Sequence, residues 1–209
     1  MPELPAIAGP PELLRPSVLA MRAYAVAPAD GLIKLDAMEN PYPWPDGLRE
    51  EWLQALAEVQ PNRYPDAAAA ALAQRLRQTF SIAPDLGLVL GNGSDELIQL
   101  LALALGGREQ CVLSPGPGFV MYRLLAGIAG LAYQEVPLRA TDFELDRDAM
   151  LAAIETHRPA LIYLAYPNNP TGNLFSRPTV EAVLDAAPGL VVVDEAYQAF
   201  CDDSFLADV

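Results

Sequence analysis

The hydrophobic positions from residue 87 onward form short runs that are separated by longer amphipathic stretches. The short apolar runs predict strands at 87–90, 110–113, 132–136, 160–165 and 190–193. The helical spacing of the stretches between them predicts helices at 94–105, 119–128, 146–156 and 176–187. Strands that alternate with helices are typical of βα units, which build a largely parallel sheet covered by helices. We therefore expect an α/β fold with three layers and a mostly parallel sheet.

The first part of the chain follows a different pattern. Residues 1–45 are rich in proline and poorly periodic, which predicts an extended arm with one short strand at 32–35. An amphipathic helix is expected to start near Asp46, a plausible N-cap, because apolar residues recur at helical spacing at Leu48, Trp52, Leu56 and Val59. A second helix is expected over 67–80, where alanine is abundant.

Composition and charge exclude several classes of function. The 209 residues are 52% hydrophobic, which is enough for a sizeable core, and the formal net charge is −14. That charge repels nucleic acid and anionic membrane surfaces, so neither is an expected partner. The N-terminus lacks the pattern of a signal peptide, and apolar runs are too short to span a membrane. We expect a cytoplasmic protein.

Cysteine and histidine are too few for a predicted metal site. Cys111 and Cys201 lie far apart in the sequence, and His157 is the only histidine. Two buried free thiols in a reducing compartment are the expected state of the cysteines. His157 follows a predicted helix, so we interpret it as a surface residue and not as a catalytic base.

Four unusual segments follow predicted strands. They are GNGSDE at 91–96, SPGPGF at 114–119, YPNNPTG at 166–172 and DEAY at 194–197. Ligands of open α/β sheets bind beyond the carboxyl ends of the strands, so these segments should meet at one edge of the sheet. This convergence is the main physical argument for a binding site.

Each segment also has a simpler interpretation. The glycine turn before Ser94 could bring backbone N–H groups to a phosphate, or it could be an ordinary turn with Ser94 as N-cap. It lacks the third glycine of a dinucleotide site and a following lysine, so a nucleotide-binding domain has little support. Asn169 could point its amide at a ligand or only form a turn, and Phe119 could be core or a flat face for a ring. Asp194 ends an apolar strand, so its carboxylate needs a cationic or hydrogen-bonding partner unless it serves as an N-cap.

Taken together, and in this order, GNGSDE, PGPGFVMY, YPNNPTGN and VVVDEAY resemble the fold-type I pyridoxal-phosphate (PLP) aminotransferases. The segments MRAY, LDAMENPY and NRYPD are similar to the histidinol-phosphate aminotransferase branch. The resemblance runs from about Arg15 to the end of the chain. It implies an N-terminal arm and part of a small domain at 1–45, and an incomplete PLP-binding large domain at 46–209, cut before the C-terminal small domain.

The resemblance also implies roles around the cofactor ring. Asp194 would pair with the pyridinium nitrogen and keep it protonated, so that the ring can accept an electron pair. Asn169 and Tyr197 would donate hydrogen bonds to the phenolic oxygen, and Phe119 would stack on the ring.

Further residues would hold the phosphate and the substrate. The phosphate would be bound at a helix start by backbone groups of Ser94, Asp95 and Glu96. Tyr64 would reach into the site of a neighbouring subunit in a homodimer; without the resemblance, its position before Pro65 predicts a packed turn aromatic. Tyr24 and Asn40 would lie near the substrate.

The implied reaction transfers an amino group between histidinol phosphate or imidazole-acetol phosphate and glutamate or 2-oxoglutarate, in histidine biosynthesis. The family's Schiff-base lysine would follow the DEAY segment by more than this chain provides, and the one lysine present, Lys34, matches no family lysine. We therefore expect a fragment with no catalytic residue of its own and little activity. Alternatives are another aminotransferase or a decarboxylase of the same fold, or a non-catalytic fragment that binds PLP or dimerises.

Overall fold

The computed structural model describes residues 13–21, 30–33, 39–106 and 110–208. The chain divides into two compact units, one formed by residues 1–28 and 91–205 and the other by 29–90 and 206–209. This division differs from the one predicted at residues 45 and 46, which stays a prediction. Tyr24 and Lys34 lie outside the described residues.

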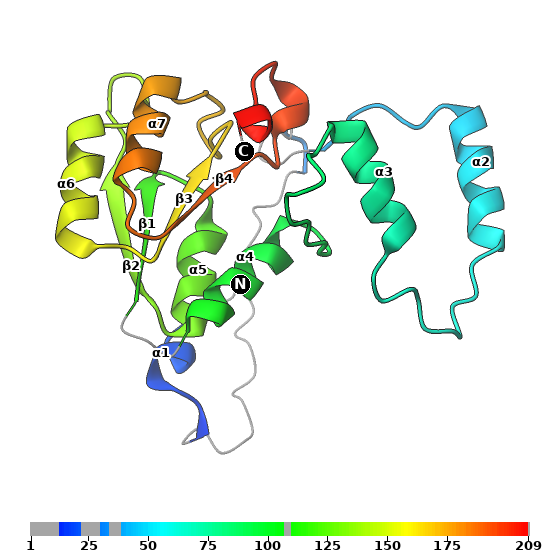
Figure 1. Cartoon of the computed structure of the whole chain (residues 1–209), viewed down its shortest axis with the longest axis horizontal. Helices are drawn as coiled ribbons and strands as arrows, with labels where there is room; N and C mark the ends of the chain where they lie inside the picture. The colour runs from blue at the N-terminus through cyan, green and yellow to red at the C-terminus, as the bar shows by residue number, and fades with distance from the viewer. Residues whose placement is uncertain (1–12, 22–29, 34–38, 107–109, 209) are drawn as a thin grey trace. The chain divides into compact units, whose positions relative to one another are not determined.

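A four-stranded parallel sheet forms the centre of the larger unit (Figure 1). Its strands are β1 (Cys111–Gly116), β2 (Ala132–Pro137), β3 (Leu161–Ala165) and β4 (Leu190–Asp194). They lie in the order β2-β1-β3-β4, and every neighbouring pair is parallel. Four of the predicted strands are thus confirmed, and β1 runs three residues further than expected, to Gly116.

Helices cover both faces of this sheet. Side chains of a strand point alternately to opposite faces, so Val112 packs with α4 (Ser94–Leu105) and α5 (Val120–Ala129), whereas Leu113 packs with α6 (Arg147–His157) and α7 (Arg177–Ala186). Both side chains are fully buried. Burying a side chain of this size contributes about 1.5–3 kcal/mol. The predicted three-layer α/β arrangement is confirmed, with a separate core on each face of the sheet.

Helix α1 (Pro16–Leu19) also belongs to the larger unit and lies against α5. The Arg15 guanidinium, just before α1, donates to the carbonyl of Ile128 in α5. Short 3₁₀ turns, η2 (Gln198–Phe200) and η3 (Leu206–Asp208), follow the last strand.

The smaller unit contains α2 (Asp46–Ala57) and α3 (Ala70–Phe80), and neither helix has a buried residue. Asp46 is the first helical residue, so its prediction as N-cap is wrong; Pro45 holds that position without a side-chain bond. Helix α3 begins later than expected because the Asp66 carboxylate accepts the N–H groups of Ala68 and Ala70 at 3.0 and 2.9 Å and holds a turn there.

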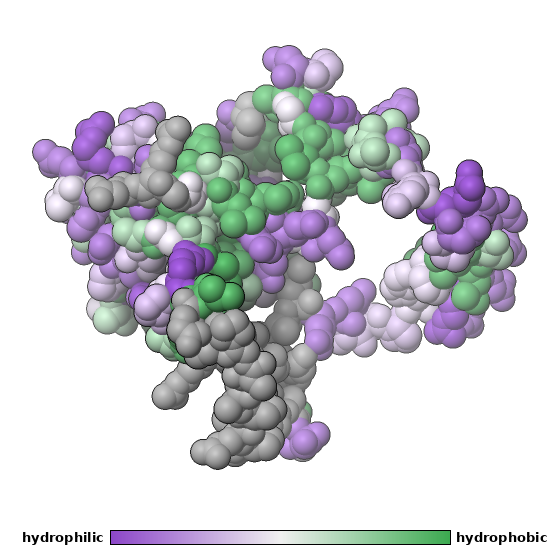
Figure 2. All heavy atoms as spheres, turned by 90° about the horizontal axis from the view of Figure 1, so that it is seen from below, coloured by the Kyte–Doolittle hydropathy of each residue, from purple (hydrophilic) through white to green (hydrophobic). Residues whose placement is uncertain are grey.

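Apolar side chains on α2 remain open to solvent. The predicted stripe is about half exposed at its four positions, from 44% to 58%, at Leu48, Trp52 and Leu56 in α2 and at Val59 just after it. Figure 2 shows hydrophobic residues, in green, at the surface next to hydrophilic residues, in purple. A stripe of this kind needs a partner surface to be buried.

The strands predicted at 87–90 and 32–35 are not confirmed. Residues 87–90 form no strand, and Val89 is 71% exposed. A run of β-forming residues becomes a strand only where another strand completes its ladder, and none of the described strands does so. Residues 32 and 33 are irregular, whereas 34 and 35 lie outside the described part.

The thiols are less buried than predicted. Cys111 and Cys201 are free but only partly buried, because one opens β1 and the other lies in the turn after η2. His157 is the last residue of α6 and is exposed, which confirms the prediction of a surface residue.

Alkaline pH should unfold the protein through its buried phenols. Burial raises the pKa of Tyr122, Tyr163 and Tyr166 above the usual value. Stability is therefore complete below the unfolded-state pKa of about 10 and falls above it, by up to about 1.4 kcal/mol per group and pH unit. In an absorbance titration, three of the eight tyrosines should ionise only on unfolding. Reversible titration of all eight in the folded chain would contradict this.

Candidate functional site

The carboxyl ends of β1, β3 and β4 gather three of the predicted segments at one edge of the sheet. In the β3–β4 register, Ala165 lies beside Asp194. One residue further, the Tyr166 N–H donates to the Asp194 carbonyl at 2.8 Å. The loop at 166–172 and the segment at 194–197 therefore start side by side, as the sequence predicted.

Asp194 has the hydrogen-bonding partner that its position required. Its carboxylate is partly buried, with Oδ2 accepting the Tyr122 hydroxyl at 2.7 Å and Oδ1 accepting the Ala196 N–H at 3.0 Å. A carboxylate offers about four lone-pair positions, so two of them are used here. Asp194 can accept a further proton donor without losing either contact.

Tyr122 is the residue that the sequence analysis missed. It lies in α5 three positions after Phe119, so the two side chains share one helix face. Its ring is only 2% exposed and the Phe119 ring meets it edge-on, with centroids 5.5 Å apart. The aromatic spacing within FVMY was the only available signal, and helix periodicity alone explains it as core.

Asn169 and Tyr197 are brought together as predicted. The Asn169 Nδ2 donates to the Tyr197 hydroxyl at 3.0 Å, and both side chains are partly buried. An amide nitrogen carries two hydrogens, so one N–H of Asn169 and the O–H of Tyr197 can still donate to a third group. The pair forms a double donor at the end of the sheet.

Phe119 is held by a tight loop that begins at Pro117. It precedes α5 as its N-cap residue and is partly buried. A Cβ on Gly118 would lie 2.6 Å from the Pro115 carbonyl oxygen, which no real side chain tolerates, so glycine permits this turn.

Asn168 joins the loop after β1 to the loop after β3. This buried side chain donates from Nδ2 to the Pro117 carbonyl at 3.1 Å and to the Thr171 hydroxyl at 2.7 Å. Its neighbour Asn169 is thereby fixed relative to the turn that carries Phe119. The sequence analysis treated the doubled asparagine through Asn169 alone.

The fourth segment forms the start of α4. The N-cap is Gly93, in a backbone conformation with φ of 82°, so the alternative that Ser94 is the N-cap is wrong. The Glu96 carboxylate turns back to accept the Asn92 N–H at 2.5 Å. The first N–H groups of a helix have no partner within it, so those of Ser94 and Asp95 are available for an anion. The carboxylates of Asp95 and Glu96 would repel an anion, so these two residues could contact it only through their backbone N–H groups.

The remaining predicted residues are not placed at this site. Tyr64 belongs to the smaller unit, where its side chain is fully exposed, so it is not the packed turn aromatic that was the alternative. Asn40 lies in the same unit, and its Oδ1 accepts the Tyr42 N–H at 3.0 Å. Their roles, like that of Tyr24, stay predictions.

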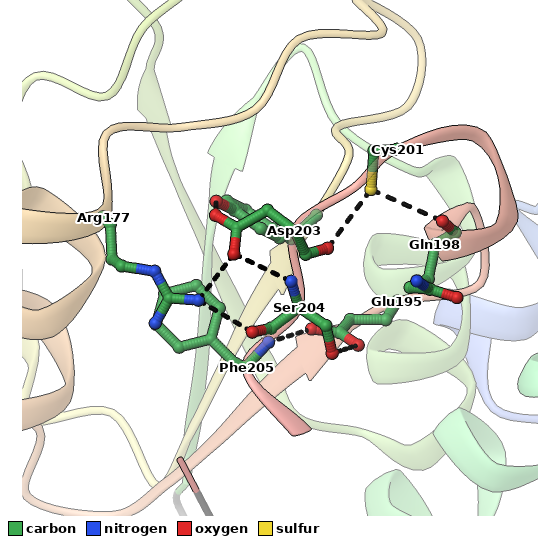
Figure 3. A network of polar contacts seen from close by, with 8 residues as sticks. Arg177, Glu195, Gln198, Cys201, Asp203, Ser204 and Phe205 are labelled. Carbon is green, nitrogen blue, oxygen red and sulfur yellow. Dashed lines mark hydrogen bonds and ion pairs between the residues drawn. The ribbon is translucent and has the colours of Figure 1, made fainter. Parts of the chain in front are cut away.

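A polar network holds the segment that carries Tyr197 (Figure 3). The Glu195 carboxylate accepts the Ser204 hydroxyl at 2.7 Å and the Phe205 N–H at 2.5 Å. Asp203 accepts Arg177 and the Tyr166 hydroxyl, each at 2.7 Å. The Arg177 guanidinium beside Asp203 is the main cause that lowers the pKa of this carboxyl to about 2. These contacts fold residues 195–205 back onto α7 and β3.

Removing one contact of this network should lower stability without unfolding the chain. Tyr166→Phe deletes the hydroxyl that donates to Asp203, so urea denaturation should show that the free energy of unfolding falls by about 1 kcal/mol.

Because the pKa of Asp203 is lowered in the folded protein, the contribution of this carboxylate to stability is present above about pH 4 and disappears as the pH falls towards 2. Asp203→Asn should therefore destabilise the protein at neutral pH and progressively less in acid. Equal destabilisation at both pH values would contradict the assignment.

Comparison with known proteins agrees with this geometry. Residues 30–209 match the family "Aminotransferase class I and II". The histidinol-phosphate aminotransferase of Thiocapsa roseopersicina is 56% identical, over 88% of this chain and 97% of that protein. Histidinol-phosphate aminotransferase 2 of Nitrosococcus oceani is 52% identical, over 92% of this chain, which spans 53% of that relative. The histidinol-phosphate aminotransferase of Chromobacterium violaceum is 54% identical, over 93% of this chain, which spans 54% of that relative.

Solved structures show the same fold. The histidinol-phosphate aminotransferase of Sinorhizobium meliloti, in complex with pyridoxal-5'-phosphate, has a TM-score of 0.76 and 24% identity, over 91% of this chain and 52% of that one. The enzyme of Clostridium acetobutylicum has a TM-score of 0.71 and 23% identity, over 83% and 51%. The chain therefore belongs to the class I and II aminotransferase family, and within it to the histidinol-phosphate aminotransferases.

Proposed function

We propose that this chain supplies the PLP-binding part of an aminotransferase that acts on histidinol phosphate. One observation carries the proposal: Asp194 ends β4 with its carboxylate oriented by Tyr122 and Ala196, next to the loop that holds Asn169 against Tyr197. This places an anionic acceptor and a double donor at the ends of adjacent strands. A pyridine ring with a protonated nitrogen and a phenolic oxygen needs these two kinds of group.

Asp194 has the chemistry that the ring nitrogen of the cofactor needs. Asp194 keeps unused lone pairs beside its contacts with Tyr122 and Ala196, so it can accept the N–H of a pyridinium. A hydrogen bond between two charged groups of this kind is worth about 1.5–3 kcal/mol. PLP, when bound, supplies an electron sink for the pair left by the substrate Cα–H bond, and a protonated nitrogen strengthens it.

The other contacts of the cofactor follow from the same edge of the sheet. The free N–H of Asn169 and the O–H of Tyr197 would donate to the phenolic oxygen and favour its anionic form. Phe119 would offer its ring face for stacking. Backbone N–H groups of Ser94 and Asp95, with that of Glu96, would hold the phosphate at the start of α4.

The substrate assignment rests on the relatives, which are named histidinol-phosphate aminotransferases. This chain spans about half the length of several of them. The amino-group partners are a phosphorylated amino substrate and glutamate. The one lysine of the chain, Lys34, lies outside the described residues, and the proposed turnover is that of an enzyme of the relatives' full length that includes this sequence, called the full-length enzyme below.

A homodimer is part of the proposal. Tyr64 is fully exposed, as a residue that reaches a neighbouring subunit must be, and the apolar stripe of α2 is open. Both features call for a second protein surface. Among the described helices, none is long and apolar enough to cross a membrane. Because the proposed substrates are small metabolites, we propose that the enzyme works in the cytoplasm.

The test is Asp194→Asn in the full-length enzyme, because amide for carboxylate keeps the shape and removes the charge. The apparent Kd for PLP should rise about 10-fold to 100-fold, and turnover of histidinol phosphate with 2-oxoglutarate should fall by orders of magnitude. Equilibrium dialysis and a coupled glutamate assay measure the two.

Asp202→Asn is the matched control, since Asp202 is an exposed aspartate on the same segment. It should leave both quantities unchanged. Near-normal turnover in Asp194→Asn would refute the ring-nitrogen assignment. Normal cofactor binding with preference for a different amino substrate would instead indicate another aminotransferase of the same fold.

A further inference from the structure

We propose that Tyr122 is a positioning residue of the cofactor site, which orients the Asp194 carboxylate by donating a hydrogen bond to it, so that Asp194 can hold the proton on the ring nitrogen. The proposal rests on the function proposed above. It concerns a residue that touches Asp194 and not the ring.

The contact is direct and its direction is fixed. The Tyr122 hydroxyl lies 2.7 Å from Oδ2 of Asp194. Burial, and then the charge of Asp194, raises the pKa of Tyr122, so the phenol keeps its proton and donates. The hydroxyl occupies one lone pair of Oδ2 and leaves others free for the ring nitrogen. It also limits the carboxylate's rotation about its own bond, since the Ala196 N–H holds the other oxygen.

Two aromatic rings pack against Tyr122. Its ring stacks on Tyr163 with centroids 4.4 Å apart and planes 2° from parallel. The Tyr163 hydroxyl donates to the Ile98 carbonyl of α4 at 3.3 Å. Phe119 packs edge-on against the other part of the ring.

One buried side chain thus links three parts of the site, two by direct contact and one through Tyr163. It touches Phe119, which would stack on the ring, and Asp194, which would pair with the nitrogen. Through Tyr163 it reaches α4, whose first turn would hold the phosphate. A residue that only filled the core would need some partner for its hydroxyl, but not this carboxylate.

The experiment compares Tyr122→Phe with Tyr166→Phe in the full-length holoenzyme. Each variant keeps the ring and deletes a buried hydroxyl that donates to an aspartate at 2.7 Å, but Asp203 lies outside the ring contacts. Urea denaturation should therefore show similar losses of stability. Turnover should fall about 10-fold to 100-fold in Tyr122→Phe, with KM changed much less, and should fall far less in Tyr166→Phe, whose hydroxyl supports the segment of Tyr197 only through Asp203.

The readout that separates positioning from packing is the ring nitrogen itself, observed by NMR with isotope-labelled PLP. In Tyr122→Phe its signal should move towards the unprotonated form, whereas in Tyr166→Phe it should match the parent. A fluorinated tyrosine at position 122, which keeps the volume and is a stronger donor, should move the signal in the opposite direction. That second variant decides the question if the phenylalanine variant folds poorly.

Identical ring-nitrogen signals in all three variants, or equal turnover losses in the two phenylalanine variants, would overturn the proposal. Failure of the proposed function looks different: the parent enzyme would then show no protonated ring nitrogen, and Asp194→Asn would bind PLP normally. A double-mutant cycle adds a check, because Tyr122→Phe should have little further effect on the Kd for PLP once Asp194 is asparagine.

Discussion

The parallel pairing of β1, β3 and β4 is the constraint on which the candidate site depends. Parallel strands end at the same edge, and the register places Ala165 beside Asp194, so segments that are far apart in the sequence emerge next to one another. The two cores, one on each face of the sheet, hold this register, because slipping a strand by one residue would turn its buried side chains to the wrong layer. The packing on the two faces of the sheet therefore keeps the loops of the candidate site in place.

The site is also supported from outside the sheet. Asn168 fixes the loop after β1 to the loop after β3, and Tyr122 fixes α5 to the end of β4. The network of Glu195, Asp203 and Arg177 holds the segment that carries Tyr197. Each of these polar side chains has at least one hydrogen-bond partner, although the buried Oδ1 of Asn168 has none among the described residues. Such contacts make a loop with few apolar contacts rigid enough to present donors in fixed directions.

Most of the fold followed from periodicity, and most of the site from motifs at strand ends. Runs such as 160–165 are apolar throughout because β3 is buried on both faces, so the pattern alone identified them. The strand expected at 87–90 failed because a ladder needs a partner, which local sequence does not specify. Tyr122 was missed for a related reason: its spacing from Phe119 describes a core helix face equally well, and only the tertiary fold brings the Asp194 carboxylate to its hydroxyl. The roles of Tyr64 and Asn40 stay predictions.

The central claim is that Asp194 and the Asn169–Tyr197 pair bind opposite polar atoms of one heterocycle. The most direct measurement is a crystal structure of the full-length enzyme with PLP bound. The account predicts the Asp194 carboxylate about 2.7–2.9 Å from the ring nitrogen, with Asn169 and Tyr197 both donating to the phenolic oxygen. A ring bound elsewhere, or one whose nitrogen faces a neutral group while Asp194 contacts only protein, would contradict it.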